Sequence, residues 1–255
     1  MGSSQTNGTV KTARTTFQIL EALKRRNGAT VTELTEEFDL SNSSIHNYLN
    51  TLEEDGYVVK NGKEYKVGLR LLDLGGFARR DQRIYDIAKS GVTSLAESTG
   101  EMANLVVEEK GKGVYLHRAH GDKAVKTDSY TGQRVHLHNT ALGKAILAHL
   151  PTERVDEIID QHGLPETTPN TITTRDALFE ELETIREEGV SFDDEARVQG
   201  LRCVAVPIIN NNDRVEGAIS VSGPTSRLQG EVFTREIPEE LESAANVIEL
   251  NITYM

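Results

Sequence analysis

The stretch SNSSIHNYLNTLEEDGYVVKNGKEYKVG, residues 41–68, determines the expected fold of the N-terminal part of this chain. Its first half places apolar side chains at helical spacing on one face, at Ile45, Tyr48, Leu49 and Leu52. Ser41 is a suitable N-cap and Gly56 a suitable end for this helix. Two strand-like segments, residues 57–60 and 64–67, then flank Asn61-Gly62, a strong hairpin signal. A helix followed at once by such a hairpin is typical of the end of a winged helix–turn–helix.

Two more helical patterns precede this stretch. Residues 12–26 have Phe17, Leu20 and Leu23 on one expected face, and Asn27-Gly28 ends that helix. Thr30, with Glu33 three residues later, forms a capping-box pattern that opens a second helix. Its apolar stripe is Val31, Leu34 and Phe38. We therefore expect a winged helix–turn–helix DNA-binding domain over residues 10–68, after a disordered tail over residues 1–9.

The rest of the chain predicts a linker and a second domain. Residues 69–82 form an amphipathic linker helix with two apolar strips, more than one domain needs to bury. Residues 83–255 mix strands with helices, including an apolar hairpin of residues 201–209 and 215–222. Strands paired in hairpins and covered by helices favour an α+β domain with an antiparallel sheet.

Composition excludes several classes of protein. The chain has 255 residues and a single cysteine, which excludes a disulfide framework, a CxxC zinc finger and a cysteine-ligated iron–sulfur cluster. No segment has the apolar length of a signal peptide core or a membrane span, so we expect a cytoplasmic protein without a membrane partner. The net charge is −12, and residues 69–255 carry 20 basic against 31 acidic side chains. We interpret this surface as one adapted to a salt-rich cytoplasm, such as that of a halophilic archaeon.

The outward side chains of the third helix point to DNA. All can form hydrogen bonds and none is acidic, although Asp and Glu make up 40 of the 255 residues: Asn42, Ser43, Ser44, His46, Asn47, Asn50 and Thr51. Asparagine pairs bidentately with adenine, and hydroxyls reach bases or phosphates. Basic residues on or before the first helix (Lys11, Arg14 and residues 24–26) and in the hairpin (Lys60, Lys63, Lys66) are candidates for phosphate contacts. The alternative is a winged helix that binds another protein.

The sequence gives less support to an enzymatic function or a metal site. Gly143-Lys144 lacks both the earlier glycine and the following Ser or Thr of a phosphate-binding loop. Cys203 begins an apolar strand, which favours a buried, inert thiol over a nucleophile. The pairs His117/His120 and His136/His138 are interpreted as surface or strand-edge histidines, with a metal site left open. We expect no catalytic residue and no cofactor.

Three separated stretches resemble the IclR family of transcriptional regulators. They are YVVKNGKEYKVGLRLLDLG, GQRVHLHNTALGKAILAHLP and REEGVSFDDEARVQGLRCVAVPIINNNDRVEGAISVSGPTSRL. The resemblance implies a GAF-like effector-binding domain after the linker helix, and promoter binding as a homodimer or homotetramer. It places an effector pocket at Thr140, Ala141, Leu142, Asp193, Cys203, Ser220 and Ser222. Asn42 and Asn47 depart from it, because they stand where the family often carries basic residues, and Val135 replaces a usual proline.

The residues themselves agree with part of this pocket. Ser220 and Ser222 alternate along one strand, so both face the same side, and Cys203 lies on the partner strand of that hairpin. Thr140 opens a helix whose N–H groups suit an anion, and Asp193, expected in a loop, suits hydroxyl groups. We therefore expect a regulator whose binding to promoter DNA responds to a hydroxy or sugar acid and which controls carbon catabolism genes. The alternative is a metabolite-binding protein whose winged helix contacts another protein.

Overall fold

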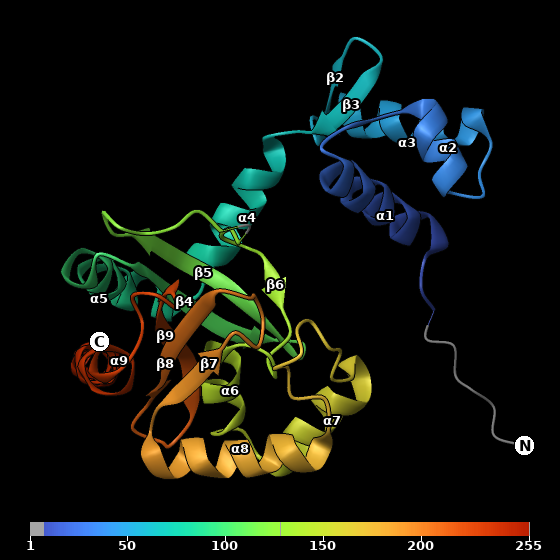
Figure 1. Cartoon of the computed structure of the whole chain (residues 1–255). Coiled ribbons are helices and arrows are strands. Elements are labelled where there is room, and N and C mark those ends of the chain that lie inside the picture. Colours follow the sequence, from blue (N-terminus) through green and yellow to red (C-terminus); the bar gives the residue numbers. More distant parts are fainter. Residues whose placement is uncertain (1–7, 128, 255) are drawn as a thin grey trace, which may run out of the picture. The chain divides into compact units, whose positions relative to one another are not determined.

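The computed structural model of this chain describes residues 8–127 and 129–254, which form two compact units divided after Ala78 (Figure 1). The tail expected over residues 1–9 therefore lies, up to Asn7, outside the described residues.

The first unit contains three helices and a small sheet. Its elements are α1 (Lys11–Arg26), β1 (Ala29–Thr30), α2 (Val31–Glu37), α3 (Asn42–Glu54), β2 (Val58–Asn61) and β3 (Glu64–Val67). The three strands pair antiparallel in the order β1-β3-β2. Thr30 and Glu33 form the predicted capping box, and the Ser41 hydroxyl caps α3. Ile19, Leu34 and Leu49, one from each helix, meet in the core. The winged helix–turn–helix prediction is confirmed.

Two details of this unit differ from the sequence prediction. Phe17 is 67% exposed, and the buried face of α1 is centred on Ile19 and Leu23. A three-residue spacing drifts around a helix of 3.6 residues per turn, so Phe17 lies far around the helix from Leu23. In the hairpin, Asn61 pairs with Glu64, which leaves Gly62 and Lys63 as the turn. Gly62 has φ +63°, the conformation that glycine adopts at little cost.

Helix α4 (Arg70–Arg80) corresponds to the predicted linker helix. It contains no buried residue, and Leu69, Leu72, Leu74 and Phe77 on and beside it are each more than half exposed. Leu71 alone packs partly against the core of the first unit. The apolar strips are thus uncovered in the single chain.

The second unit is a six-stranded antiparallel sheet with helices on both faces (Figure 1). The strand order is β6-β5-β4-β9-β8-β7. The strands are β4 (Met102–Glu109), β5 (Lys112–His120), β6 (Arg134–Val135), β7 (Ser191–Asp194), β8 (Leu201–Ile209) and β9 (Val215–Pro224). Neighbouring strands pair antiparallel throughout. This confirms the predicted α+β class with an antiparallel sheet.

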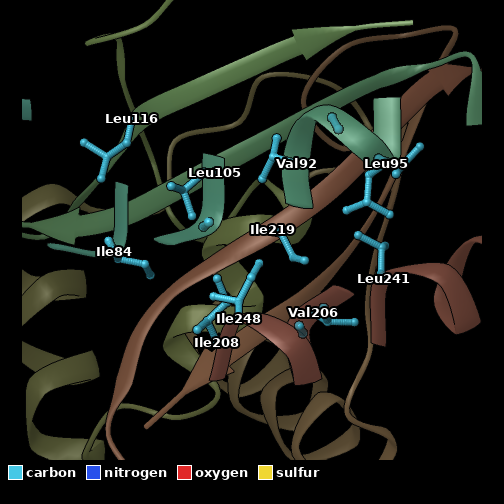
Figure 2. Close-up of a cluster of buried hydrophobic side chains, with 14 of the residues drawn as sticks. Ile84, Val92, Leu95, Leu105, Leu116, Val206, Ile208, Ile219, Leu241 and Ile248 are labelled. Atoms are coloured by element: carbon cyan, nitrogen blue, oxygen red, sulfur yellow. The ribbon is translucent and has the colours of Figure 1, made fainter. Parts of the chain in front are cut away.

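Helices cover the two faces of this sheet with separate cores. One face carries α5 (Arg83–Thr99) and α9 (Ile237–Tyr254). The short π-helix η1 (Val232–Glu236) directly precedes α9. Figure 2 shows that core, where Val92 and Leu241 of these helices pack on Leu105 and Ile219 of the sheet. The other face carries α6 (Ala141–Leu147), with α7 (Thr152–His162) and α8 (Arg175–Glu188) beyond it.

One prediction in this unit is wrong. Asp193, expected in a loop, lies in the edge strand β7. Two of the four β7 residues are Asp193 and Asp194, a residue type that strands disfavour, so the pattern gave no strand signal. Asp193 pairs with Cys203 of β8, which fixes the acid to the sheet.

No helix in the described part of the chain is long and apolar enough to cross a membrane.

Candidate functional site

One side of α3 presents uncharged polar groups to solvent. Ser43, His46, Asn47 and Asn50 are exposed and have the i, i+3, i+4, i+7 spacing of a single helical stripe, with Asn42 beside them. The opposite side buries Ile45, Leu49 and Leu52 in the core of the unit. The core therefore fixes the stripe rigidly on a helix, as base recognition in a major groove requires.

Hydroxyl groups at the start of α3 serve the helix itself. Ser41 Oγ accepts the N–H of Ser44 at 3.2 Å and lies 2.9 Å from the Oγ atoms of both Ser43 and Ser44. Ser44 is half-buried. Of the predicted contact residues on α3, His46, Asn47 and Asn50 are thus the ones placed beyond this capping cluster.

The predicted phosphate-contacting residues divide into two groups. Lys11, Arg14, Lys60 and Lys63 are exposed at the start of α1 and on the hairpin, and Lys60 Nζ lies 5.1 Å from the ring centroid of Tyr65. By contrast, Arg26 Nε contacts Glu37 at 2.7 Å, Arg25 shares the same carboxylate, and Lys24 pairs with Glu21. The structure therefore favours the start of α1 and the hairpin as the cationic regions.

A polar row crosses the α6 side of the large sheet, from β5 to β7. It consists of Arg118, Asn104, Ser220, Ser222, Cys203 and Asp193. Asn104 Nδ2 donates to Ser220 Oγ at 3.1 Å and to Ser222 Oγ at 3.4 Å, while its Oδ1 accepts from Arg118 Nε at 3.0 Å. Ser222 Oγ donates to Cys203 Sγ at 3.1 Å. Antiparallel register brings these residues together from five strands.

A cavity of about 50 Å³, the sheet cavity, opens over this row. Its lining combines the row with the start of α6 and the loops before β6 and β8: Met102, Asn104, Tyr115, Arg118, Thr127, Ser129, Thr140, Leu142, Asp193, Arg197, Val198, Leu201, Arg202, Cys203 and Ser222. Such a volume holds a few waters or one small polar group. The lining offers hydroxyl, amide, carboxyl and guanidinium groups, which suit a small polar ligand.

Asp193 is the most strongly perturbed acid at this site. Its side chain is 7% exposed, and burial raises the pKa of its carboxyl to about 6. Three neighbours oppose the effect of burial and lower this pKa. The N–H of Ala196 donates to Asp193 Oδ1 at 2.7 Å, and Arg197 and Lys144 act through their positive charge.

Burial also raises the pKa of the Cys203 thiol, to about 11, so the thiol is protonated and is no nucleophile at neutral pH. Cys203 is half-buried and opens onto the cavity, not fully buried as expected.

The start of α6 is organised by its own cap. Thr140 Oγ1 accepts the N–H of Gly143 at 3.0 Å, which uses one of the donors expected to face an anion. A Cβ at Gly143 would lie 2.1 Å from the carbonyl oxygen of Leu137, so only glycine lets α6 pack this closely. Lys144 is buried and pairs with Glu181 of α8. Gly143-Lys144 therefore serves packing, in agreement with the rejection of a phosphate-binding loop.

Five of the seven residues predicted for the pocket line the sheet cavity: Thr140, Leu142, Asp193, Cys203 and Ser222. Ala141 and Ser220 are fully buried beside it. Sequence reasoning missed Asn104, Arg118 and Arg197. Asn104 had a usable signal, since it is a lone amide between Ala103 and Leu105 in an apolar strand. The two arginines had none, because only sheet order brings them to the row.

The four histidines considered for a metal do not gather. His136 lies edge-on to His138 at 5.4 Å between ring centroids, and His117 contacts Thr93 and Tyr85 on the other face of the sheet. Burial and the neighbouring Lys112 lower the pKa of His136 to about 4. Within residues 8–127 and 129–254, no group of three or more His, Cys, Asp or Glu side chains is placed to hold a metal ion.

Models of one protein family match both units of this chain. The family model described as the IclR helix-turn-helix domain matches residues 13–62, and that described as the bacterial transcriptional regulator IclR C-terminal domain matches residues 77–250. A probable HTH-type transcriptional regulator ArcR of Halobacterium salinarum is 35% identical over 92% of this chain and 91% of its own length. The acetate operon repressor of Salmonella typhimurium is 28% identical over 89% and 85%. The crystal structure of the Thermotoga maritima IclR has a TM-score of 0.77 and 33% identity, and the match covers 94% of this chain and 98% of that one.

Proposed function

Because this chain belongs to the IclR family of transcriptional regulators, whose members join a DNA-binding helix–turn–helix to an effector-binding domain, we propose how its residues divide the work. It is a DNA-binding regulator and not an enzyme. In our proposal, His46, Asn47 and Asn50 of α3 read bases, with Asn42, Ser43 and Ser44 at its start. The sheet cavity holds the effector. The observation that carries this proposal is the uncharged, exposed stripe of α3 in a chain of net charge −12.

The effector is a small hydroxy or sugar acid. Support comes from the lining of the sheet cavity, where Ser222, Thr140 and Asn104 supply hydrogen bonds to hydroxyl groups. A control of carbon catabolism genes fits such a ligand and is in line with the name of the Salmonella relative, an acetate operon repressor. As a regulator that binds promoter DNA, the protein is proposed to act in the cytoplasm.

Transcript profiling tests the regulated genes. Deletion of the gene is expected to change transcripts of enzymes that use organic acids or sugars, since effector and regulon are normally linked. If the changed transcripts belong to other processes only, the assignment to carbon catabolism is wrong, while DNA binding itself stands.

The protein is expected to be at least a dimer, held partly by α4. Leu72 and Phe77 are 71% and 66% exposed, and paired recognition helices match two-fold operators. Sedimentation at micromolar concentration should show a dimer or tetramer, and Leu72→Glu with Phe77→Glu should weaken it. Val247→Glu, at an apolar site of similar exposure on α9, is the control and should keep the dimer. A monomeric wild-type protein contradicts this prediction.

The hairpin lysines are expected to contact phosphates without reading sequence. Lys60→Ala and Lys63→Ala should weaken specific and non-specific DNA binding alike, and each should reduce the slope of log K against log salt by about 1. Arg26→Ala is the matched control, because this guanidinium already pairs with Glu37, and it should change the slope little. Anisotropy titrations over a salt series, with specific and with non-specific DNA, measure the affinities and the slope. An unchanged slope for the lysine variants would remove the hairpin from the interface.

A further inference from the structure

An irregular segment between α7 and α8 supports one wall of the sheet cavity. Residues 163–174 form neither helix nor strand, yet Thr168 and Thr171 within this segment are 7% and 8% exposed. Both threonines contact the loop that joins β7 to β8, and that loop contributes Arg197 and Val198 to the cavity lining. Because buried hydroxyl groups need hydrogen-bond partners, the partners of these threonines indicate what the segment does.

Three threonine hydroxyls donate to the main chain of the β7–β8 loop. Thr171 Oγ1 lies 2.7 Å from the carbonyl oxygen of Ala196. The same hydroxyl accepts the N–H groups of Thr167 and Thr168 at 3.1 and 3.0 Å, so its single proton points to that carbonyl. Thr168 Oγ1 lies 2.7 Å from the carbonyl oxygen of Glu195, and Thr167 Oγ1 lies 2.9 Å from that of Ala196. We call Thr167, Thr168 and Thr171 the threonine brace.

The brace holds the same residue that holds Asp193. The N–H of Ala196 donates to Asp193 Oδ1 at 2.7 Å, and Asp193 belongs to the cavity lining. Glu195 has φ +60°, a left-handed conformation that a residue other than glycine keeps only where its surroundings impose it. The hydroxyls of the brace impose it, because they fix the carbonyl oxygens of both Glu195 and Ala196. The loop is thus held by Asp193 on one side and by the brace on the other.

The segment is also fixed to the start of α6, a second wall of the cavity. Asn139 Nδ2 donates to Thr167 Oγ1 at 3.3 Å, and His138 Nε2 lies 3.1 Å from the carbonyl oxygen of Pro165. Asn139 directly precedes Thr140, which lines the cavity. One chain of hydrogen bonds therefore runs from the start of α6 through the brace to the loop after β7.

We propose that the threonine brace positions the effector site: it holds the loop after β7 so that Asp193 and Arg197 face the sheet cavity. This inference rests on the proposed use of the cavity for the effector. In the described part of the chain the three threonines are not among the lining residues, so they act on a ligand only through the loop. Loss of a brace hydroxyl is therefore expected to weaken the effector response without removing a ligand contact.

Cys203 provides a probe of the loop, since it is the single cysteine of the chain, lines the cavity and pairs with Asp193 across two strands. The reagent is methyl methanethiosulfonate, which transfers its methylthio group to the thiolate and releases methanesulfinate. A cavity of about 50 Å³ holds only a few waters, so the reagent reaches Cys203 when a wall moves. A more distant Asp193 carboxylate also lowers the pKa of the thiol. Both effects raise the labelling rate when the loop loosens.

Thr171→Val in the full-length protein should raise the labelling rate of Cys203 by about fivefold or more, the effect of losing one hydrogen bond. Thr171→Ser keeps the hydroxyl and should label at nearly the wild-type rate. Thr184→Val is the matched control, because Thr184 Oγ1 donates at 3.2 Å to the carbonyl oxygen of Glu180 within α8. Its labelling rate should equal that of the wild type.

Circular dichroism melting shows whether each variant is folded. If Thr171→Val does not fold, Thr167→Val at an exposed position of the same brace replaces it. Equal labelling rates for the folded valine variant and the wild-type protein overturn the proposal. Labelling of Thr171→Ser as fast as that of Thr171→Val overturns it as well, because the hydroxyl then does not hold the loop.

A promoter–reporter assay with added gluconate or glycerate separates this inference from the proposed function. If Thr171→Val speeds labelling and loses induction while its DNA affinity is unchanged, both are supported. If it speeds labelling but keeps normal induction, the brace holds the loop and the effector role of the cavity fails. If labelling is unchanged, the brace assignment fails whatever the reporter shows.

Discussion

Asp193→Ala is expected to abolish the response to effector while DNA binding stays intact. The carboxyl lines the sheet cavity and, by accepting the N–H of Ala196, also anchors the loop that carries Arg197. Its loss removes a ligand contact and the support of that loop, so the coupling lost is about 1–3 kcal/mol, or roughly 5- to 150-fold in effector-dependent DNA affinity. Ser222→Ala should act similarly, since Ser222 joins Asn104 to Cys203 across the row.

The neighbouring acid provides the control for this prediction. Asp194 is adjacent in sequence but half exposed and engaged with Arg202, so Asp194→Ala should retain the response. A promoter–reporter assay measures the response, and anisotropy with labelled promoter DNA measures affinity without effector. Normal induction of the Asp193→Ala and Ser222→Ala variants would refute the pocket assignment. A simultaneous loss of DNA binding would indicate a damaged fold, and thermal melting detects that case.

Asn47→Ala is expected to remove sequence preference without removing DNA binding. An asparagine that pairs bidentately with a base contributes about 1–3 kcal/mol of discrimination, whereas non-specific binding depends on phosphate contacts elsewhere. Specific affinity should therefore fall by about tenfold or more, with non-specific affinity nearly unchanged. His46→Ala should show the same pattern.

Thr51→Ala on the same helix is the control for Asn47. Its hydroxyl donates to the carbonyl oxygen of Asn47 at 3.0 Å, so this side chain is engaged within the helix. Competition titrations with specific and shuffled DNA should give nearly the wild-type ratio for this variant. If Asn47→Ala keeps the wild-type ratio as well, α3 is not the reading helix.

Local sequence signals predicted the helices and hairpins well because their causes are local. Thr30 with Glu33 and Ser41 with the N–H of Ser44 act within one turn, and they place the starts of α2 and α3. The strands of the β8–β9 hairpin follow from continuous apolar runs. Phe17 was placed wrongly because a spacing of three residues does not follow one face of a helix with 3.6 residues per turn.

The candidate site was predictable only in part, since long-range register assembles it. Ser220, Ser222 and Cys203 share a hairpin, so alternation alone put them on one face. Arg118 and Arg197 come from β5 and from a loop after an edge strand that has no propensity signal. Only the strand order β5-β4-β9-β8-β7 brings them to the polar row. The sequence therefore indicated the hydroxyl groups of the cavity but not its guanidinium groups.

The most direct test of ligand-responsive, sequence-specific DNA binding is a gel-shift titration with the DNA upstream of the protein's own gene. We expect saturable binding that survives a large excess of shuffled DNA of the same composition. We also expect a changed midpoint when an acid that binds the sheet cavity is added. Equal affinity for the upstream and shuffled DNA, over a full salt series and with the protein shown to be folded, would contradict it.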